Sequence, residues 1–173
     1  LEIALPDATA NDLRLWLTLV GLGLGTAWLA LLLEITVWGA TLSGCAAMLS
    51  GFAIGWLLHP HAMVFAWTPW LAATGLAAMR GPNIRATLWL AIAWAGLWTA
   101  GHPQTAVHGA LFAFAIWGLF GHRDLKRRAF FVAMGLLIGS LLAAPAMLPF
   151  LDNALESTTR LDRGGNTLPF SSM

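Results

Sequence analysis

The chain has 173 residues, of which 58% are hydrophobic and 10% charged, with a formal net charge of +1 at pH 7. Soluble domains carry about 25% charged residues, so this composition excludes an ordinary soluble domain and favours a membrane protein. The near-neutral charge gives no indication of nucleic acid as a partner. The single cysteine, Cys45, excludes a disulfide framework.

Hydropathy predicts about six membrane segments, because a bilayer core needs about 20 apolar residues per helix. These runs lack the alternation typical of barrel strands, so we expect an all-α, polytopic transmembrane bundle. Pro69 predicts a kinked or re-entrant third segment, and Pro145 and Pro149 should bend or end the sixth. The expected segments are 13–33, 37–58, 62–79, 86–100, 105–120 and 129–150.

Charge predicts the orientation of these segments. Six of the nine basic residues lie in two expected loops, 80–85 and 121–128. Lys and Arg favour cytoplasmic loops, so residues 1–12 become an extracytoplasmic lead-in and residues 151–173 an extracytoplasmic tail. The first and second segments meet at Glu34 without a basic residue, and Glu34 either pairs within the bundle or reaches the headgroups.

Small residues recur along the first two segments. Such spacing lets helix backbones approach closely, so we interpret the residues as packing positions. They are Gly21, Gly23, Gly25, Gly39, Ser43, Gly44, Ala47, Gly51 and Gly55.

Two polar breaks on the predicted outer face are the main candidate site. They are His59-Pro60-His61 and Gly101-His102-Pro103-Gln104. Proline disfavours the α conformation in the residue before it, so His59 and His102 should lie where helices break. Thr105 is expected to cap the next helix, with His108 one turn further along.

Three interpretations of these histidines stay open. They are interfacial residues that only end helices, or they line a polar pocket for a charged headgroup or phosphate, or they bind a metal. His102 and His108 are six residues apart and would point to different faces of one helix. A zinc site needs three or four ligands, so we predict no metal and no cofactor.

Two further features have alternative interpretations. The tryptophans near the outer loops form either an aromatic belt or a stacking surface for a sugar ring or polyprenyl chain; they are Trp56, Trp67, Trp70 and Trp98. Arg160 and Arg163 in the tail either bind a phosphate or belong to a solvated loop.

The order and spacing of several short motifs resemble those of bacterial YfhO-type membrane proteins, which belong to the GT-C superfamily of polytopic glycosyltransferases. The resemblance covers about residues 13–160. The motifs are Ser50-Gly51-Phe52, Leu58-His59-Pro60-His61, Trp67 with Pro69, Ala100-Gly101-His102-Pro103-Gln104-Thr105, and Leu148-Pro149-Phe150 followed by Ser157 and Arg160.

The resemblance implies transfer of a sugar from a polyprenyl-phosphate-linked donor at the outer face of the bacterial cytoplasmic membrane. Membrane lipids and the donor would be partners. It also implies a catalytic acid in an outer loop before residue 1, so no catalytic residue is assigned. The absence of an arginine pair near Glu34 departs from the family pattern. The expected substrate-binding residues are His59, His61, His102, Gln104, His108 and Arg160.

Two alternatives belong to other functional classes. Helices with proline breaks can line a path through the membrane, which would suit a transporter or a flippase-like protein. A membrane scaffold without chemistry would use the histidines only to end helices.

Overall fold

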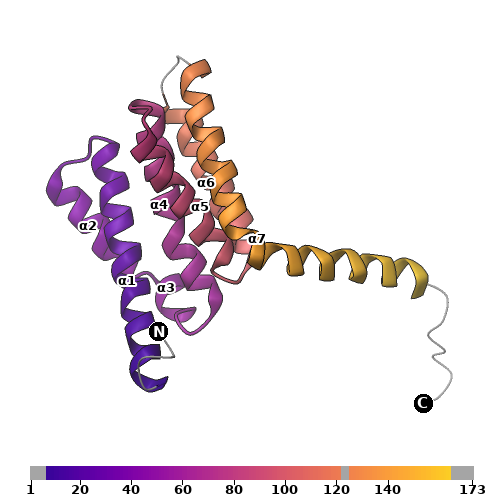
Figure 1. The fold of residues 1–173 in the computed structure, drawn as a ribbon. Helices are drawn as coiled ribbons and strands as arrows, with labels where there is room; N and C mark the ends of the chain where they lie inside the picture. The colour runs from indigo at the N-terminus through magenta and orange to yellow at the C-terminus, as the bar shows by residue number, and fades with distance from the viewer. Residues whose placement is uncertain (1–6, 122–124, 165–173) are drawn as a thin grey trace.

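The computed structural model describes residues 7–121 and 125–164, and this part of the chain is helical without any strand (Figure 1). The result confirms the expected all-α helical bundle. The helices in chain order are α1 (Asp7–Leu32), α2 (Val37–Met48), α3 (Gly51–Gly55), α4 (Pro60–Arg80), α5 (Ile84–Thr99), α6 (Pro103–Phe120) and α7 (Leu125–Gly164).

The long helices run alternately up and down, so their connections gather at two opposite ends (Figure 1). We call one the basic end; it holds Arg80 and Arg128, and there the Arg80 guanidinium donates a hydrogen bond to the carbonyl of Leu32 at the end of α1. We call the other the histidine end, where the rings of His61 and His102 are in contact.

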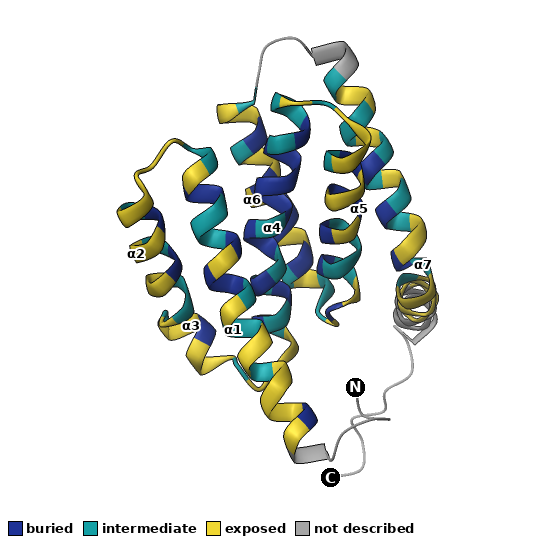
Figure 2. Ribbon diagram, turned by 60° about the vertical axis from the view of Figure 1, so that its left-hand side comes forward, coloured by how far each residue is buried: buried dark blue, intermediate teal, exposed yellow. Residues whose placement is uncertain are grey.

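Helix α4 is the centre of the bundle. Its 18-residue apolar window is 67% buried, against 17–33% in the other helices that are long and apolar enough to cross a membrane. Figure 2 shows buried residues concentrated on α4 and exposed ones on the outer faces. Large apolar side chains lie on those faces, and Trp38 is 82% exposed. Such a surface is typical of a protein that contacts lipid.

Among the described residues, four segments have the length and composition of membrane spans, fewer than the six expected. Helix α5 has only 16 residues, which cover about 24 Å at 1.5 Å per residue, whereas a bilayer core is about 30 Å thick. Helix α6 has 18 residues and opens with Pro103 and Gln104. The four spans are Thr9–Leu32, Val37–Gly55, Pro60–Arg80 and Arg128–Asn153.

The second expected segment is interrupted. Helix α2 ends at Met48, and α3 begins after Ser50, whose hydroxyl accepts a hydrogen bond of 3.2 Å from the amide of Ala53. Serine favours this capping position because its side chain satisfies an amide that lacks a partner in the first turn. The sequence 37–58 therefore forms two helices.

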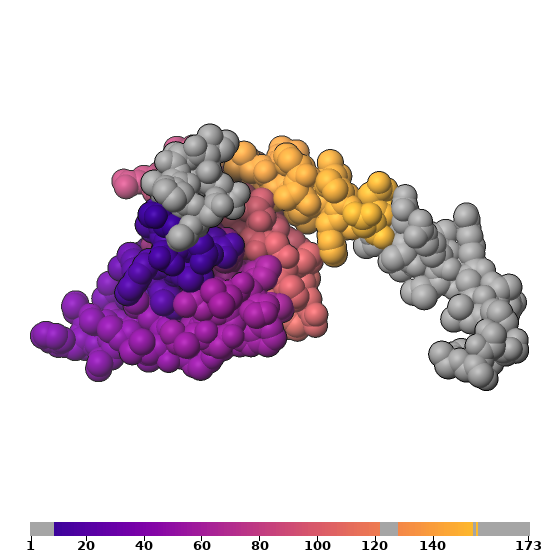
Figure 3. Space-filling model, turned by 90° about the horizontal axis from the view of Figure 1, so that it is seen from below, coloured from indigo at the N-terminus to yellow at the C-terminus, as the bar shows by residue number. Residues whose placement is uncertain are grey.

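Helix α7 bends and continues beyond the expected sixth segment. It contains Pro145 and Pro149, and Figure 1 shows its later part turning away from the bundle, as Figure 3 also shows from below. The bend agrees with the prediction. The expectation of a loop after Phe150 is wrong for residues 151–164, which are helical and contain neither proline nor glycine before Gly164.

Glycines make room for tryptophans between the helices. A Cβ on Gly75 would overlap the ring of Trp117, and one on Gly25 would lie 2.6 Å from Nε1 of Trp70. Both indoles also donate hydrogen bonds across helices, Trp70 to the Gly21 carbonyl at 2.8 Å and Trp117 to the Ala72 carbonyl at 2.9 Å. Trp70 therefore packs between helices.

The predicted packing through small residues is confirmed for only some of the positions in the first two segments. A Cβ on Gly44 would lie 2.6 Å from the Gly23 carbonyl, so α1 and α2 approach closely there. By contrast, a Cβ on Gly21, Gly51 or Gly55 would meet no atom within 4 Å. The close approach is therefore local.

Glu34 lies in the turn between α1 and α2. It is exposed, and its φ of 65° is in the left-handed region, which disfavours residues with a Cβ. Of the two alternatives, the exposure favours a carboxylate that reaches outward.

Candidate functional site

The two polar breaks share one local design. His59 precedes α4 and His102 precedes α6, both with extended backbone, and each is followed by proline at the first helical position. Proline suits this position because it has no amide to satisfy and its φ matches the helix. The predicted helix breaks at His59 and His102 are therefore confirmed.

The cap of α6 is His102, and the prediction that Thr105 would act as the cap is wrong. The amide of Thr105 donates to Nδ1 of His102 at 3.3 Å, and the Thr105 hydroxyl lies 2.8 Å from the same nitrogen. The cap lies three residues before Thr105 because Pro103 begins the helix. Before it, Gly101 has a φ of 94°, a conformation that glycine adopts without strain.

Three histidines from the two breaks come together at the histidine end. We call His59, His61 and His102 the imidazole cluster. The ring centroids of His61 and His102 are 3.7 Å apart, and those of His59 and His61 are 6.5 Å apart. Trp56 packs on the cluster at 4.5 Å from His61 and 5.3 Å from His59.

The environment of His61 distinguishes it within the cluster. Its Nδ1 atom is buried and has no hydrogen-bond partner in the structure, whereas Nδ1 of His102 is occupied by Thr105. Nδ1 of His61 is therefore the buried ring nitrogen of the stacked pair that is left without a partner.

An apolar groove of about 600 Å³ begins at the imidazole cluster. His61 and Pro69 both line it, so it extends about 12 Å along α4. We call it the histidine groove. It is lined by Leu22, Thr26, Leu29, Ala47, Phe52, Trp56, His61, Phe65, Thr68, Pro69, Thr105, His108, Gly109 and Phe112.

The remaining predicted site residues lie in different places. His108 is exposed and shares the histidine groove with His61. Gln104 instead lines a separate cavity of about 560 Å³, together with Met147 and Phe150 of α7. Arg160 belongs to α7, but its side chain lies outside the described residues. The structure thus gathers His59, His61 and His102, adds His108 through the groove, and separates Gln104.

Carboxylates and metal-binding groups do not gather at the histidine groove in the described part of the chain. Among residues 7–121 and 125–164, no group of three or more His, Cys, Asp or Glu side chains has an arrangement that holds a metal ion. The described lining of the histidine groove includes no Asp or Glu. The groove itself therefore offers imidazoles, hydroxyls and apolar surface.

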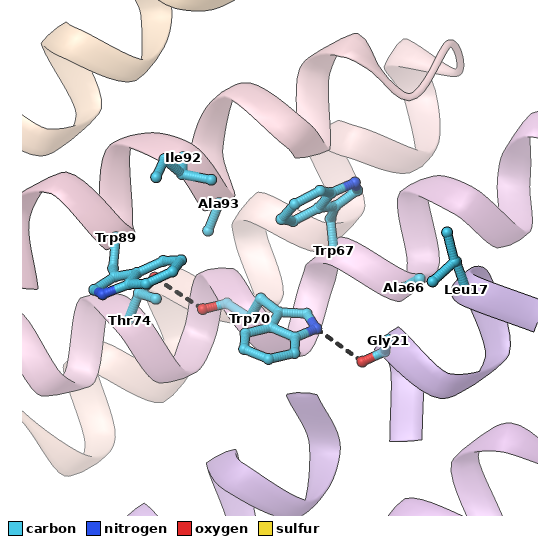
Figure 4. Close-up of a pocket in the computed structure, with 9 residues that line it drawn as sticks. All are labelled: Leu17, Gly21, Ala66, Trp67, Trp70, Thr74, Trp89, Ile92 and Ala93. Carbon is cyan, nitrogen blue, oxygen red and sulfur yellow. Dashed lines mark hydrogen bonds between the residues drawn. The ribbon is translucent and has the colours of Figure 1, made fainter. Parts of the chain in front are cut away.

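A further cavity, of about 360 Å³, was not predicted (Figure 4). Trp67, Trp70 and Trp89 line it. The dashed lines in Figure 4 mark two internal hydrogen bonds: Trp70 donates to the Gly21 carbonyl, and the Thr74 hydroxyl donates to the Trp70 carbonyl at 2.8 Å. Because its described lining has no histidine and no charged side chain, this cavity is a weaker candidate for a phosphate than the histidine groove.

Comparisons of this chain with protein-family models, with curated proteins and with solved structures find no match.

Proposed function

We propose that this chain is the lipid-binding membrane part of a GT-C-like glycosyltransferase that uses a polyprenyl-phosphate-linked sugar donor. The site would work at the outer face of the bacterial cytoplasmic membrane. The observation that carries the proposal is the histidine groove, which is mainly apolar and is lined at one end by His61, a residue whose buried Nδ1 has no partner among the described residues.

The shape of the groove suits a lipid with a phosphate at one end. An isoprenoid chain would lie along Phe65 and Phe112. There its apolar surface would exchange contacts with water and lipid for close packing against the groove. The phosphate would then meet the imidazole cluster, where ring N–H groups can donate hydrogen bonds. A long apolar lipid without a headgroup would leave these polar groups unused.

The chemistry assigned to this chain is stabilisation of the leaving group. When the sugar leaves its carrier, negative charge develops on the phosphate, and fixed hydrogen-bond donors lower the energy of that state. Activation of the acceptor hydroxyl needs a base, usually a carboxylate. No carboxylate is among the described lining residues, so we assign this role to no residue of the groove.

The test is sugar transfer from a radiolabelled polyprenyl-phosphate-sugar by the protein that carries this chain. His61→Gln removes the imidazole, and His102→Asn removes the second imidazole while keeping a side chain that caps helices well. Both should lower transfer by about tenfold, the loss of one strong hydrogen bond to a charged phosphate. Thr99→Ala is the control, because Thr99 lies at the same end with its hydroxyl bonded to the Ala95 carbonyl.

The same membranes distinguish the alternatives. Wild-type transfer by both histidine variants, at equal membrane abundance, would contradict the role of the imidazole cluster. Movement of the lipid across the bilayer without a new glycosidic bond would favour a flippase-like protein over an enzyme. Absence of donor binding, transfer and movement in the wild type would favour a scaffold.

A further inference from the structure

A second groove lies at the basic end, away from the proposed donor site. It has a volume of about 450 Å³ and lies where α4, α6 and α7 meet. One lining residue is charged, and the others are apolar or glycine. The groove is lined by Met79, Phe114, Trp117, Gly118, Gly121, Arg128, Ala129, Val132, Ala133 and Leu136.

Arg128 is the unusual feature of this groove. The side chain is partly buried, and one terminal nitrogen of its guanidinium, Nη1, is buried without a hydrogen-bond partner among the described residues. A guanidinium nitrogen removed from water without a partner is costly, so such groups are normally paired with an anion. The described lining of the groove contains no Asp or Glu, which leaves this position open for an anion from outside the chain.

The positive charge of the neighbouring sequence favours an anionic lipid headgroup over a zwitterionic one. Residues 123–128 contain four basic residues and one acidic residue. Basic pockets between membrane helices attract anionic headgroups more strongly than zwitterionic ones. The guanidinium can hold a phosphate through two parallel hydrogen bonds, a geometry that lysine does not offer.

The apolar remainder of the groove favours a lipid over a soluble anion. From Arg128 to Leu136 the groove follows α7 for about 12 Å, and from Gly121 to Phe114 it follows α6 for about 10 Å. A free phosphate would fill only the space beside Arg128. An acyl chain attached to that phosphate would cover the apolar walls as well.

We propose that this groove, which we call the arginine groove, binds an anionic phospholipid, with its phosphate at Arg128 and an acyl chain along α6 and α7. The inference is independent of the donor site, because the two grooves have no lining residue in common. It assigns the basic end a specific lipid contact.

The experiment is native mass spectrometry of the full chain, loaded with phosphatidylglycerol or phosphatidylcholine of equal acyl length. The wild type should retain phosphatidylglycerol at least fivefold more than phosphatidylcholine. Arg128→Gln should abolish this preference, whereas Arg85→Gln should leave it within twofold of wild type. Arg85 is the matched control because it is an exposed arginine at the same end but outside the arginine groove.

A second variant tests the acyl contact without changing charge. Gly118 lines the groove, and a Cβ there meets no atom within 4 Å, so Gly118→Leu adds its side chain from an open position of the groove wall. This variant should also lose retained phosphatidylglycerol. Equal losses for Arg128→Gln and Arg85→Gln would overturn the proposal, and so would full displacement by millimolar glycerol phosphate, which would identify a soluble-anion site. Retention unchanged in Gly118→Leu would overturn the acyl contact.

Discussion

Replacing Gly75 with alanine tests the packing of tryptophan over glycine at the centre of the bundle. The added Cβ would overlap the ring of Trp117, a side chain that is only 6% exposed. Overpacking of this kind costs about 1–3 kcal/mol. Displacing the ring also breaks its 2.9 Å hydrogen bond to the Ala72 carbonyl, at about 1 kcal/mol. The better helix propensity of alanine returns about 1 kcal/mol, so we expect a net loss of about 2 kcal/mol.

The assay is reversible unfolding of the full chain in mixed micelles, followed by tryptophan fluorescence. Gly118→Ala is the control, because it makes the same substitution beside Trp117 in open space and should raise stability slightly. The decisive step is a double-mutant cycle. In a Trp117→Leu background the ring is gone, so Gly75→Ala should cost almost nothing, and the coupling free energy should exceed about 1 kcal/mol.

Two results would refute this reasoning. One is wild-type stability of Gly75→Ala, which would mean that the ring moves away without cost. The other is additivity of the two substitutions, which would mean that Gly75 matters for a reason other than Trp117.

Substitutions at three further positions test the local geometry by the same unfolding assay. Gly101→Ala places a Cβ at a φ of 94° and should lower the free energy of unfolding by about 1–2 kcal/mol; an unchanged value would contradict the left-handed conformation. His102→Ala should cost about 1 kcal/mol as a lost cap and His102→Asn much less, whereas equal losses would show that capping is unimportant. Glu34→Gly should relieve about 1 kcal/mol of backbone strain, and Glu34→Gln, which keeps the Cβ, should show no gain.

Much of the helical layout could be predicted, because apolar length is a property of the sequence itself. The break at Ser50 was missed, although it has a local signal. Serine favours the position just before a helix, where its hydroxyl accepts a hydrogen bond from the amide three residues later. The helical course of residues 151–164 was missed because charge was interpreted as loop character. Charged and polar residues without proline or glycine are equally compatible with an exposed helix.

The candidate site could be predicted only in part, because its composition depends on packing between distant helices. Alternation of the helices brings the two histidine breaks to one end, so the meeting of His61 and His102 follows from topology. Gln104 faces another cavity because α7 contributes Met147 and Phe150 there. The unpartnered nitrogens of His61 and Arg128 have no signature in the sequence. Whether such an atom finds a hydrogen-bond partner depends on which side chains the packing of distant helices brings near it.

The short helices on one side of the bundle have a consequence for the surrounding bilayer. Helix α5 covers about 24 Å and α6 about 27 Å. These two helices are several ångströms shorter than a bilayer core of about 30 Å. Hydrophobic mismatch of this size is relieved by thinning of the adjacent lipid. The protein would therefore draw the two leaflets together beside α5 and α6, and shorten the path between headgroups on opposite faces.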